Sequence, residues 1–388
     1  MKVLIVHNFY KIRAGEYSVF NNEMNLLKDN NHELITYHKD NKTINSISSK
    51  LRSFLNVIFS KKVYKEFDRL LKKEKPDIIH VHNFFPIITP SIFFAAKDNK
   101  IPIIQTLHNY RHICPSAILM HKNKIYEKSI TNGVFSTVID KVYQNSYLGT
   151  FALARMINYH KKKDTWNSKV NKFIALTQFS KSKFEEAGFL PSKITVKPNF
   201  VFDIKKDDIK KEKFALFVGR IGEEKGIKIL IDAWKNIDYP LTIAGSGPLE
   251  NELKSLNHKN INFIGSQDKD KIVELMNSAS FLVIPSIWYE GFPMVILEAY
   301  SAGLPVLGSK IGSVGEVVID KVTGFQFKPN DPIDLSKKVN VVIKNQPLLL
   351  ELSKNARKHY LDNFTPEKNY QELINIYKEV IHENSPKD

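Results

Sequence analysis

Two glutamates stand eight positions apart in an otherwise apolar segment, PSIWYEGFPMVILEAYSAGLPVLG (285–308). Pro293 is a favourable first residue for a helix, because its ring presets φ and it lacks an N–H that a helix start would leave unbonded. Glu290 would then lie in the loop before the helix. Glu298 would lie inside a helix that is apolar on every side and therefore buried. A buried carboxylate needs a hydrogen-bonding partner, which could be a protein cation or a ligand rich in hydroxyls.

Cations and glycines follow other strand-like runs in the second half of the chain. FVGRIGEEKG (217–226) places Arg220 and Lys225 between a predicted strand and a predicted helix. Two cations beside glycines at a helix start can clamp a diphosphate, although surface salt bridges explain the two residues equally well. GSGP (245–248) begins with Gly245, whose missing side chain would let the backbone come close to a ligand. The GxxxxGK[ST] pattern of a Walker loop is absent from the sequence.

Histidines end two predicted strands of the first half. His108 closes PIIQTLH (102–108), and an imidazole at the carboxyl end of a parallel strand can hydrogen-bond a polar ligand. A lone histidine is nevertheless more often structural. His80 and His82 are two positions apart, so on a strand they share a face. Because no Asp, Glu or Cys nearby in the sequence completes a metal site, we expect them to line a cleft.

Two further segments have the spacing of phosphate or metal motifs. The loop NFYKIRAGEYSVF (8–20) follows the first predicted strand, and its Ala14-Gly15 pair could present a backbone N–H to a phosphate. Asp268 and Asp270 have DxD spacing, but they open a predicted helix. Acidic residues there cap the helix and favour its dipole, so we predict a cap rather than a metal ligand.

Short runs rich in Val and Ile alternate with helical patterns, which predicts βαβ units around parallel sheets. A chain of 388 residues is too long for one ordinary core, and the charged segment 200–213 separates its two halves. We therefore predict an α/β fold of two Rossmann-like, doubly wound domains. The predicted strands are 3–7, 33–38, 77–82, 102–108 and 172–177 in the first half, and 214–219, 241–245, 261–265, 280–285 and 304–309 in the second.

Composition narrows the class of protein. The 43% hydrophobic content is that of a folded globular chain. A single cysteine, Cys114, rules out an internal disulfide framework and fits a reducing compartment. No apolar run approaches the roughly 20 residues of a membrane span, and the N-terminus has no signal-peptide pattern. We expect a cytoplasmic protein.

The excess of positive over negative charge lies in the first half of the chain. Residues 1–200 hold 32 Lys and Arg against 15 Asp and Glu, whereas residues 201–388 hold 25 against 26. This asymmetry indicates an anionic partner, either a membrane surface or a nucleic acid, although a lysine-rich surface alone would also produce it. Residues 147–163 place an apolar segment before a basic cluster, which fits an interfacial helix or a core helix with a solvated end.

Taken in chain order, the motifs resemble those of retaining GT-B glycosyltransferases of family 4, a group with many bacterial polysaccharide and lipid-linked glycan transferases. EGFPMVILE (290–298) is similar to the EX7E motif of that family. The resemblance extends over nearly the whole chain through HNFYKIRAGE (7–16), PDIIHVHN (76–83), TLHNYRHICP (106–115) and GRIGEEKG (219–226).

The resemblance implies an architecture and a reaction. Residues 1–200 would form the acceptor-binding domain and 201–364 the donor-binding domain, facing each other across a cleft. Residues 365–388 would form a crossover helix that packs back towards the first domain. The reaction would move a sugar from a nucleotide diphosphate sugar, of the UDP or GDP type, to an acceptor hydroxyl with retention. No metal and no other cofactor would be needed.

The resemblance also implies roles for individual residues. Glu290 would contact hydroxyls of the donor sugar, and Glu298 would bind the nucleotide ribose. Arg220 and Lys225 would hold the leaving diphosphate. His108 would bond the donor sugar near the reacting centre. The remaining donor-binding positions would be Gly15, whose N–H would meet the donor phosphate, together with Gly219, Gly245, Gly291, Phe292, Met294 and Val295.

The expected acceptor is lipid-linked or a glycan, in capsule, exopolysaccharide, O-antigen or glycolipid synthesis. The basic first half would then place the protein peripherally on an anionic membrane, at the inner face of the cell membrane. Nucleic acid is not an expected partner, because the aromatic residues do not interleave with the basic ones as a stacking platform requires. Two alternatives stay open: a nucleotide-sugar epimerase of the same architecture, and a catalytically inactive scaffold at a membrane.

Overall fold

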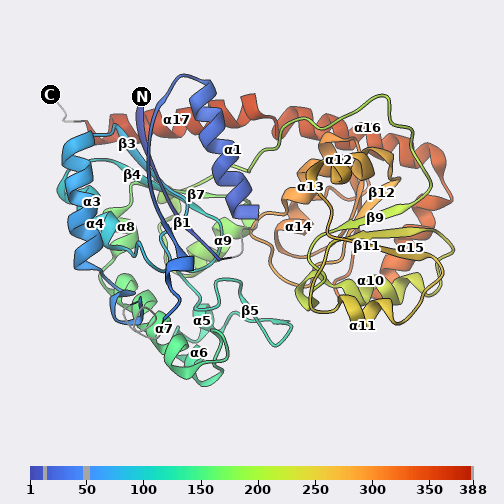
Figure 1. The fold of residues 1–388 in the computed structure, drawn as a ribbon, viewed down its shortest axis with the longest axis horizontal. Coiled ribbons are helices and arrows are strands. Elements are labelled where there is room, and N and C mark those ends of the chain that lie inside the picture. The colour runs from blue at the N-terminus through green and yellow to red at the C-terminus, as the bar shows by residue number, and fades with distance from the viewer. Residues whose placement is uncertain (12–14, 47–52, 386–388) are drawn as a thin grey trace. The chain divides into compact units, whose positions relative to one another are not determined.

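The computed structural model describes residues 1–11, 15–46 and 53–385. It contains two six-stranded parallel sheets, each within its own compact unit (Figure 1). We call these the first unit (Met1–His121, Tyr126–Pro198 and Tyr370–Asp388) and the second unit (Lys122–Ile125 and Asn199–Asn369).

The sheet of the first unit has the strand order β2-β1-β3-β4-β7-β8. The order reverses between β1 and β3, and the crevice at the carboxyl ends of strands at such a point is where open α/β sheets bind ligands. The strands are β1 (Lys2–Phe9), β2 (Glu33–Asp40), β3 (Ile78–Val81), β4 (Ile103–Leu107), β7 (Lys172–Ala175) and β8 (Ile194–Val196).

Helices cover the first sheet. Apolar residues of α1 (Gly15–Asp29) and α17 (Pro366–Asn384), including Phe20, Leu27 and Tyr377, pack in one cluster with Val3 and Ile5 of β1. The remaining elements of this part of the chain are the helices α3 (Lys61–Glu74), α4 (Ser91–Asp98), α5 (Lys128–Thr131), α6 (Ser136–Ile139), α7 (Tyr147–Lys162), α8 (Thr165–Lys169) and α9 (Gln178–Glu186), the 3-10 turns η1 (Asn41–Thr43) and η2 (Pro191–Lys193), and the short strands β5 (Met120–His121) and β6 (Lys124–Ile125).

The sheet of the second unit has the order β11-β10-β9-β12-β13-β14, which reverses between β9 and β12. Its strands are β9 (Ala215–Val218), β10 (Leu241–Ala244), β11 (Ile261–Gly265), β12 (Phe281–Ile284), β13 (Val306–Ser309) and β14 (Gly324–Phe327). The other elements are η3 (Glu223–Lys225), α10 (Ile227–Trp234), α11 (Glu250–Lys254), α12 (Lys269–Ser278), α13 (Met294–Ser301), α14 (Gly312–Val317), α15 (Pro332–Ile343) and α16 (Gln346–Asn363).

Side chains that alternate along each strand of the second sheet build a core on both faces. In β9, Ala215 and Phe217 pack with residues of α10 and α15, whereas Leu216 packs with residues of α12, α13 and α14 (Figure 1). Both faces of the sheet are therefore covered, and polar ligands can reach only the ends of the strands.

All ten strands predicted from the sequence are present, but four were missed: the two-residue strands β5 and β6, and one edge strand of each six-stranded sheet. The missed edge strands β8 (ITV) and β14 (GFQF) are three and four residues long, too short for a periodic signal. Asp268 caps α12 as predicted, since its Oδ1 accepts a hydrogen bond from the Lys271 N–H at 2.8 Å.

The prediction for the glutamate-bearing helix needs two corrections. Pro293 is the N-cap of α13 rather than its first residue. The helix is not buried all round, because Met294, Val295 and Glu298 are only partly buried, while Ile296 and Leu297 are fully buried. The three partly buried residues share one face of the helix, because Glu298 follows the other two by three and four positions. Glu298 therefore lies on the accessible face of α13.

The two interpretations of residues 147–163 both describe part of what α7 does. The helix contributes buried residues such as Leu153 and Met156 to the core. It also exposes Tyr147 and Leu148, which keep 54% and 72% of their accessible surface. Within the described residues, no helix combines the length and the apolar content that crossing a membrane requires.

Candidate active site

Polar side chains gather where β9 and β12 end, at the reversal point of the second sheet. Gly219 and Arg220 directly follow β9, and Lys225 is the last residue of η3. Glu290 lies in the loop between β12 and α13. Because β9 and β12 are neighbours in the sheet, their carboxyl ends bring these loops together, which is the position expected of a ligand site.

Lys225 and Glu290 form a close ion pair in these loops. The Lys225 Nζ lies 2.6 Å from the Glu290 Oε1, and the Ser286 hydroxyl donates a hydrogen bond to the same oxygen at 2.7 Å. Glu290 is 6% exposed, and burial alone would raise the pKa of its carboxyl. The Lys225 ammonium and the hydrogen bonds outweigh burial and lower that pKa, so Glu290 is ionised. Its partner is thus a protein cation.

Glu298 stands in contrast to Glu290. Within the described residues, no hydrogen bond or ion pair engages its side-chain carboxylate, and no side chain caps the N-terminus of its helix. Burial raises the pKa of Glu298, and the charge of Lys269 only partly opposes this. An ionisable group left without a partner on the accessible face of a helix is a candidate for ligand binding.

Glycines let the loops of this edge pack against one another. Gly226 has φ of +68°, and a Cβ there would lie 1.8 Å from the carbonyl oxygen of Pro285 after β12. Gly245 has φ of +150°, and a Cβ there would lie 1.8 Å from the carbonyl oxygen of Gly219. The sequence suggested that Gly245 lets a ligand approach. The structure gives Gly245 a role in packing two loops together, and its contact with a ligand stays a prediction.

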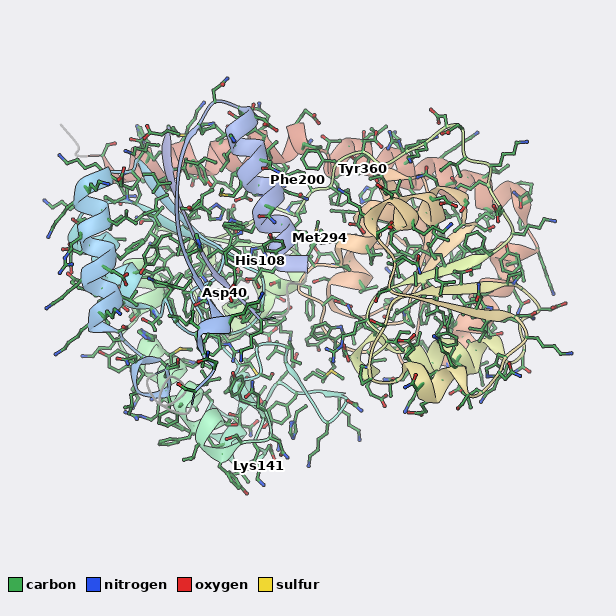
Figure 2. The ribbon with its side chains drawn as sticks, viewed as in Figure 1. Asp40, His108, Lys141, Phe200, Met294 and Tyr360 are labelled. Carbon is green, nitrogen blue, oxygen red and sulfur yellow. The ribbon has the colours of Figure 1, made fainter. Side chains whose placement is uncertain are left out.

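The other residues predicted in the second unit surround the same edge. Arg220 is exposed, with its guanidinium 3.6 Å from Glu224. Gly291 and Phe292 precede α13, and the Gly291 carbonyl accepts a hydrogen bond from the Ser313 hydroxyl at 3.3 Å. Met294 and Val295 form the first turn of that helix (Figure 2 labels Met294).

His108 and Gly15 were predicted in the first half and lie in the first unit. Gly15 is the first residue of α1, while Ala14 lies outside the described residues. His108 directly follows β4 (Figure 2). Its Nε2 is 3.0 Å from the Nδ1 of His82, and the two rings stack at 17° with centroids 5.2 Å apart. Burial and the neighbouring imidazoles lower the pKa of His108 well below its usual value.

The expectation that His80 and His82 line a cleft is wrong for His80, whereas His82 is among the residues that line a small pocket together with His108. His80 and His82 are 0% and 2% exposed, and Glu23 of α1 lies between them and Lys197. Sequence reasoning missed Glu23 and Lys197. A signal for Glu23 exists, because it belongs to the buried stripe of α1 formed by Val19, Phe20, Glu23, Leu26 and Leu27. A carboxylate in an apolar stripe requires a buried partner.

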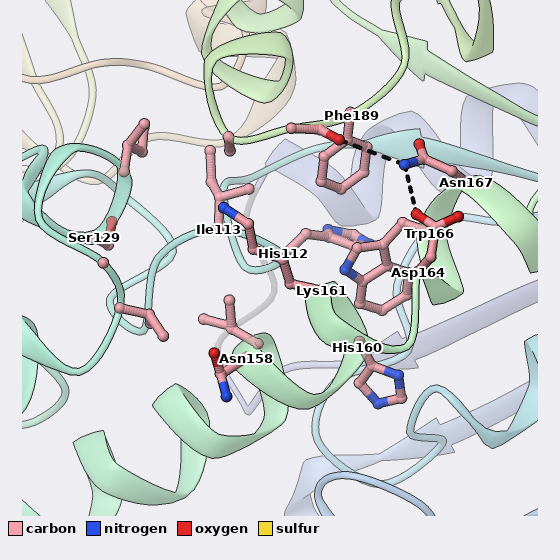
Figure 3. A pocket seen from close by; sticks show the side chains of 16 residues that line it. His112, Ile113, Ser129, Asn158, His160, Lys161, Asp164, Trp166, Asn167 and Phe189 are labelled. Carbon is pink, nitrogen blue, oxygen red and sulfur yellow. Dashed lines mark hydrogen bonds between the residues drawn. The ribbon is translucent and has the colours of Figure 1, made fainter.

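A separate pocket of about 180 Å³ lies within the first unit, between α7, α8 and the loop after α9 (Figure 3). His112, Trp166 and Ser129 line it, and each has a buried polar atom without a hydrogen-bond partner among the described residues. The cavity is large enough for ordered water, which needs a few such polar partners. It contains none of the residues predicted to bind the donor.

Comparison with known proteins identifies relatives over most of the chain. The model for Glycosyl transferases group 1 matches residues 200–359, and that for Glycosyltransferase Family 4 matches residues 28–202. An uncharacterized glycosyltransferase of Methanocaldococcus jannaschii is 29% identical over 98% of this chain and 99% of its own length. A UDP-Gal:alpha-D-GlcNAc-diphosphoundecaprenol alpha-1,3-galactosyltransferase of Escherichia coli is 27% identical over 81% of this chain and 78% of its own length.

A solved structure shares the fold. Anabaena HepE in complex with UDP aligns with a TM-score of 0.70 at 16% identity, over 98% of this chain and 100% of that one.

Proposed function

The chain belongs to the glycosyltransferase group 1 and glycosyltransferase family 4 families, whose models together match residues 28–359, and we propose that it is a retaining enzyme that transfers a sugar from a nucleotide diphosphate sugar to a lipid-linked acceptor. The observation that carries the proposal is the unpaired carboxylate of Glu298 in α13, a helix without a side-chain cap at its N-terminus, together with the Lys225–Glu290 pair in the loops at the same edge of the sheet. A ligand with ribose, diphosphate and sugar offers a partner to each of these groups.

The positive charge for the leaving diphosphate comes from Lys225 and Arg220 in this proposal. Preorganised cations aimed at developing charge are usually the largest contribution to such catalysis. Glu290 holds the Lys225 ammonium through Oε1, and we assign its other oxygen, Oε2, to a hydroxyl of the donor sugar. Glu298 accepts hydrogen bonds from the ribose hydroxyls. With two protein cations at the diphosphate, no metal ion is required.

The chemical step exchanges one bond of the anomeric carbon for another. Its bond to the diphosphate oxygen breaks, and a bond to the acceptor oxygen forms on the same face of the sugar. The acceptor proton passes to the leaving phosphate oxygen, so no protein base takes part. The second-unit edge therefore works by positioning and electrostatics.

Two relatives support the classes of substrate. HepE was solved with UDP and with UDP-glucose, which supports a UDP-type donor over a GDP-type one. The name of the Escherichia coli enzyme specifies a diphosphoundecaprenol-linked acceptor, which supports a polyprenyl-linked acceptor here. We assign the reaction to the synthesis of a capsule, an exopolysaccharide, an O-antigen or a glycolipid.

A product assay tests the reaction. The purified protein is incubated with a panel of UDP- and GDP-sugars, with and without a polyprenyl-diphosphate-linked sugar, and products are analysed by mass spectrometry and NMR. We expect an acceptor-dependent glycoside with the anomeric configuration of the donor. Conversion of the donor to an isomer without acceptor would instead establish an epimerase. Binding without any conversion would establish a scaffold, and inversion would refute the mechanism.

Peripheral binding to an anionic membrane is the second part of the proposal. Ile139 of α6 and Leu148 of α7 are 78% and 72% exposed. Lys141, labelled in Figure 2, lies with its Nζ 4.4 Å from the centroid of the exposed Tyr147 ring. Exposed apolar and aromatic side chains beside cations are the pattern of an interfacial surface, and the excess positive charge of residues 1–200 has the sign that anionic lipids attract.

Vesicle sedimentation tests this surface. We expect the protein to bind vesicles that contain anionic phospholipid, and to be released by high salt. The double variant Ile139→Asp/Leu148→Asp should no longer bind, whereas the control Leu190→Asp, at a residue of the first unit that is 49% exposed, should bind normally. Equal binding to neutral vesicles, or equal loss in the control, would refute the assignment.

A further inference from the structure

A buried hydrogen-bond network joins α1 to His108 in the first unit. The Glu23 Oε1 lies 2.9 Å from the His80 Nδ1 and 3.1 Å from the His82 Nε2. The other nitrogen of His82, Nδ1, lies 3.0 Å from the Nε2 of His108. Glu23, His82 and His108 thus form a chain in which each member contacts the next through one pair of atoms.

The charge of Glu23 is balanced inside the network. The Lys197 Nζ lies 3.8 Å from the second carboxylate oxygen of Glu23, and the side chains are 3% and 4% exposed. Burial lowers the pKa of His80 to about 4. Glu23 and Lys197 therefore supply the charges, and the imidazoles have no need of a proton for charge balance.

Hydrogen-bond chemistry then determines the tautomers of His82 and His108. An ionised carboxylate only accepts hydrogen bonds, so the Nε2 of His82 must carry the hydrogen that Glu23 accepts. In a neutral imidazole the other nitrogen is an acceptor. The Nδ1 of His82 consequently accepts, and the Nε2 of His108 must donate to it. The Nδ1 of His108 is left as a bare acceptor, and no side chain or backbone group among the described residues donates to it.

We propose that Glu23 and His82 are positioning residues that fix His108 as the Nε2–H tautomer, with Nδ1 presented as an acceptor for a hydroxyl of the donor sugar. The identity of the ligand rests on the proposed function, but the tautomer does not. A donor that carries a hydroxyl at the position facing His108 gains a hydrogen bond, and a donor that is deoxygenated there gains none. Glu23 and His82 would thereby contribute to sugar selection without touching the sugar.

A metal ion is the competing explanation, because Glu23, His80 and His82 can place one ligand atom each within 4.8 Å of one another. Two observations favour the hydrogen-bond network. Lys197 already brings a positive charge to the same carboxylate. His80 also uses both of its nitrogens, with the Tyr377 hydroxyl 2.7 Å from Nδ1 and the Thr106 hydroxyl 2.8 Å from Nε2.

NMR of the ligand-free protein tests the tautomer directly. Protein labelled with ¹⁵N-histidine is observed at neutral pH through long-range proton–nitrogen couplings, which distinguish the protonated nitrogen of each ring. The His108 signals are assigned by their loss in His108→Gln. We expect His108 to be neutral and protonated on Nε2. Protonation on Nδ1, or on both nitrogens, would overturn the proposal, whatever the catalytic activity turns out to be.

Two substitutions of His82 test its positioning role. His82→Asn keeps an acceptor oxygen near the position of Nδ1, whereas His82→Leu removes it. We expect His82→Leu to lower kcat/KM by about five- to ten-fold, the effect of one lost hydrogen bond, and to lose the single His108 tautomer. His82→Asn should keep kcat/KM near the wild-type value and should keep the single His108 tautomer. Equal losses in the two variants would show that His82 acts through packing alone.

Two controls complete the test. A donor deoxygenated at the hydroxyl that meets His108 should react equally with wild-type and His82→Leu protein, and persistent sensitivity of every deoxy donor would contradict the proposal. Metal analysis of the protein as purified, and after addition of zinc, covers the alternative. If the wild-type protein binds zinc stoichiometrically and Glu23→Gln does not, the cluster is a metal site and the proposed hydrogen-bond network is wrong.

Discussion

The carboxyl edges of the two sheets carry polar groups of opposite character. At the first edge, Glu23, His82 and His108 are bonded to one another in the interior. At the second edge, Lys225 is partly exposed and Glu298 has no partner within the described chain. Both edges rest on six-stranded parallel sheets. The comparison teaches that the sheet fixes where polar groups gather, while the elements packed beside it decide whether they bind each other or a ligand.

The reason for the difference lies in what surrounds each edge. In the first unit, α1 and α17 bring Glu23 and Tyr377 to His80 in β3. His82 directly follows β3, and Lys197 directly follows β8. In the second unit, glycines such as Gly226 and Gly245 line the loops, so fewer side chains are available to pair. The first edge is preorganised by protein groups alone, whereas we propose that a ligand completes the second.

The largest effect should come from breaking the pair at the second edge. Glu290→Ala should lower turnover by about 100-fold or more, because it removes a contact to the donor and leaves Lys225 unanchored. Lys228→Ala is the matched control, since Lys228 forms exposed ion pairs with Glu223 and Glu252. Steady-state kinetics of both variants measures the contrast. Near-wild-type turnover of Glu290→Ala would remove Glu290 from the site.

A large loss of stability should come from breaking the first edge. Glu23→Ala removes the buried carboxylate that faces the Lys197 ammonium and accepts hydrogen bonds from His80 and His82, which should lower the free energy of unfolding by about 3–5 kcal/mol. The control Glu185→Ala removes an exposed partner of Lys181 and should cost about 1 kcal/mol or less. Urea denaturation compares the two. If the two variants lose the same free energy of unfolding, the network of the first edge does not stabilise the first unit.

Acid should weaken the first unit before the second. Burial lowers the pKa of His7 to about 3 and that of His80 to about 4, so the native protein excludes protons that the unfolded chain binds below pH 6.5. Stability is therefore present above pH 6.5 and is lost as the pH falls, by about 1.4 kcal/mol per histidine at pH 5.5. Hydrogen exchange at pH 7 and pH 5.5 should show more loosening in first-unit peptides than in second-unit peptides, where burial also lowers the pKa of His359. Equal loosening of the two units would contradict the expected difference in their acid sensitivity.

The smallest effect should come from the scaffold of the second edge. Asp268→Ala removes the cap of α12 and should lower the free energy of unfolding by about 1 kcal/mol, without changing the affinity for nucleotide. Thermal denaturation and nucleotide titration measure the two quantities separately. A large loss of affinity would mean that the DxD spacing marks a ligand site after all.

Sequence reasoning reached the fold because strands and glycine loops have local signals. The two-sheet α/β fold of GT-B glycosyltransferases is confirmed by the strands, the family models and solved relatives such as HepE. The missed strands β8 and β14 are short and lie at sheet edges, where they need no long apolar run.

The interaction partners of the polar residues were harder to predict than the places of these residues in the fold. The sequence placed Glu290 and Lys225 after successive strands, but their pairing depends on side chains 65 positions apart. Glu23 lies 59 positions from His82 and Lys197 follows an unrecognised strand, so the network at the first edge had no local signal beyond one carboxylate in an apolar stripe. Long-range pairing of polar groups is set by tertiary packing.

Calorimetric titration of UDP and GDP into the wild-type protein, Glu298→Ala and Glu274→Ala tests the central claim most directly. Glu274 is a surface residue of α12 that pairs with Lys271, so it serves as the control. One nucleotide should bind at a single site, and Glu298→Ala alone should weaken it by about ten-fold or more, the effect of hydrogen bonds to a charged group. Equal affinity in all three proteins, or no binding of either nucleotide, would contradict a second edge that is completed by the donor.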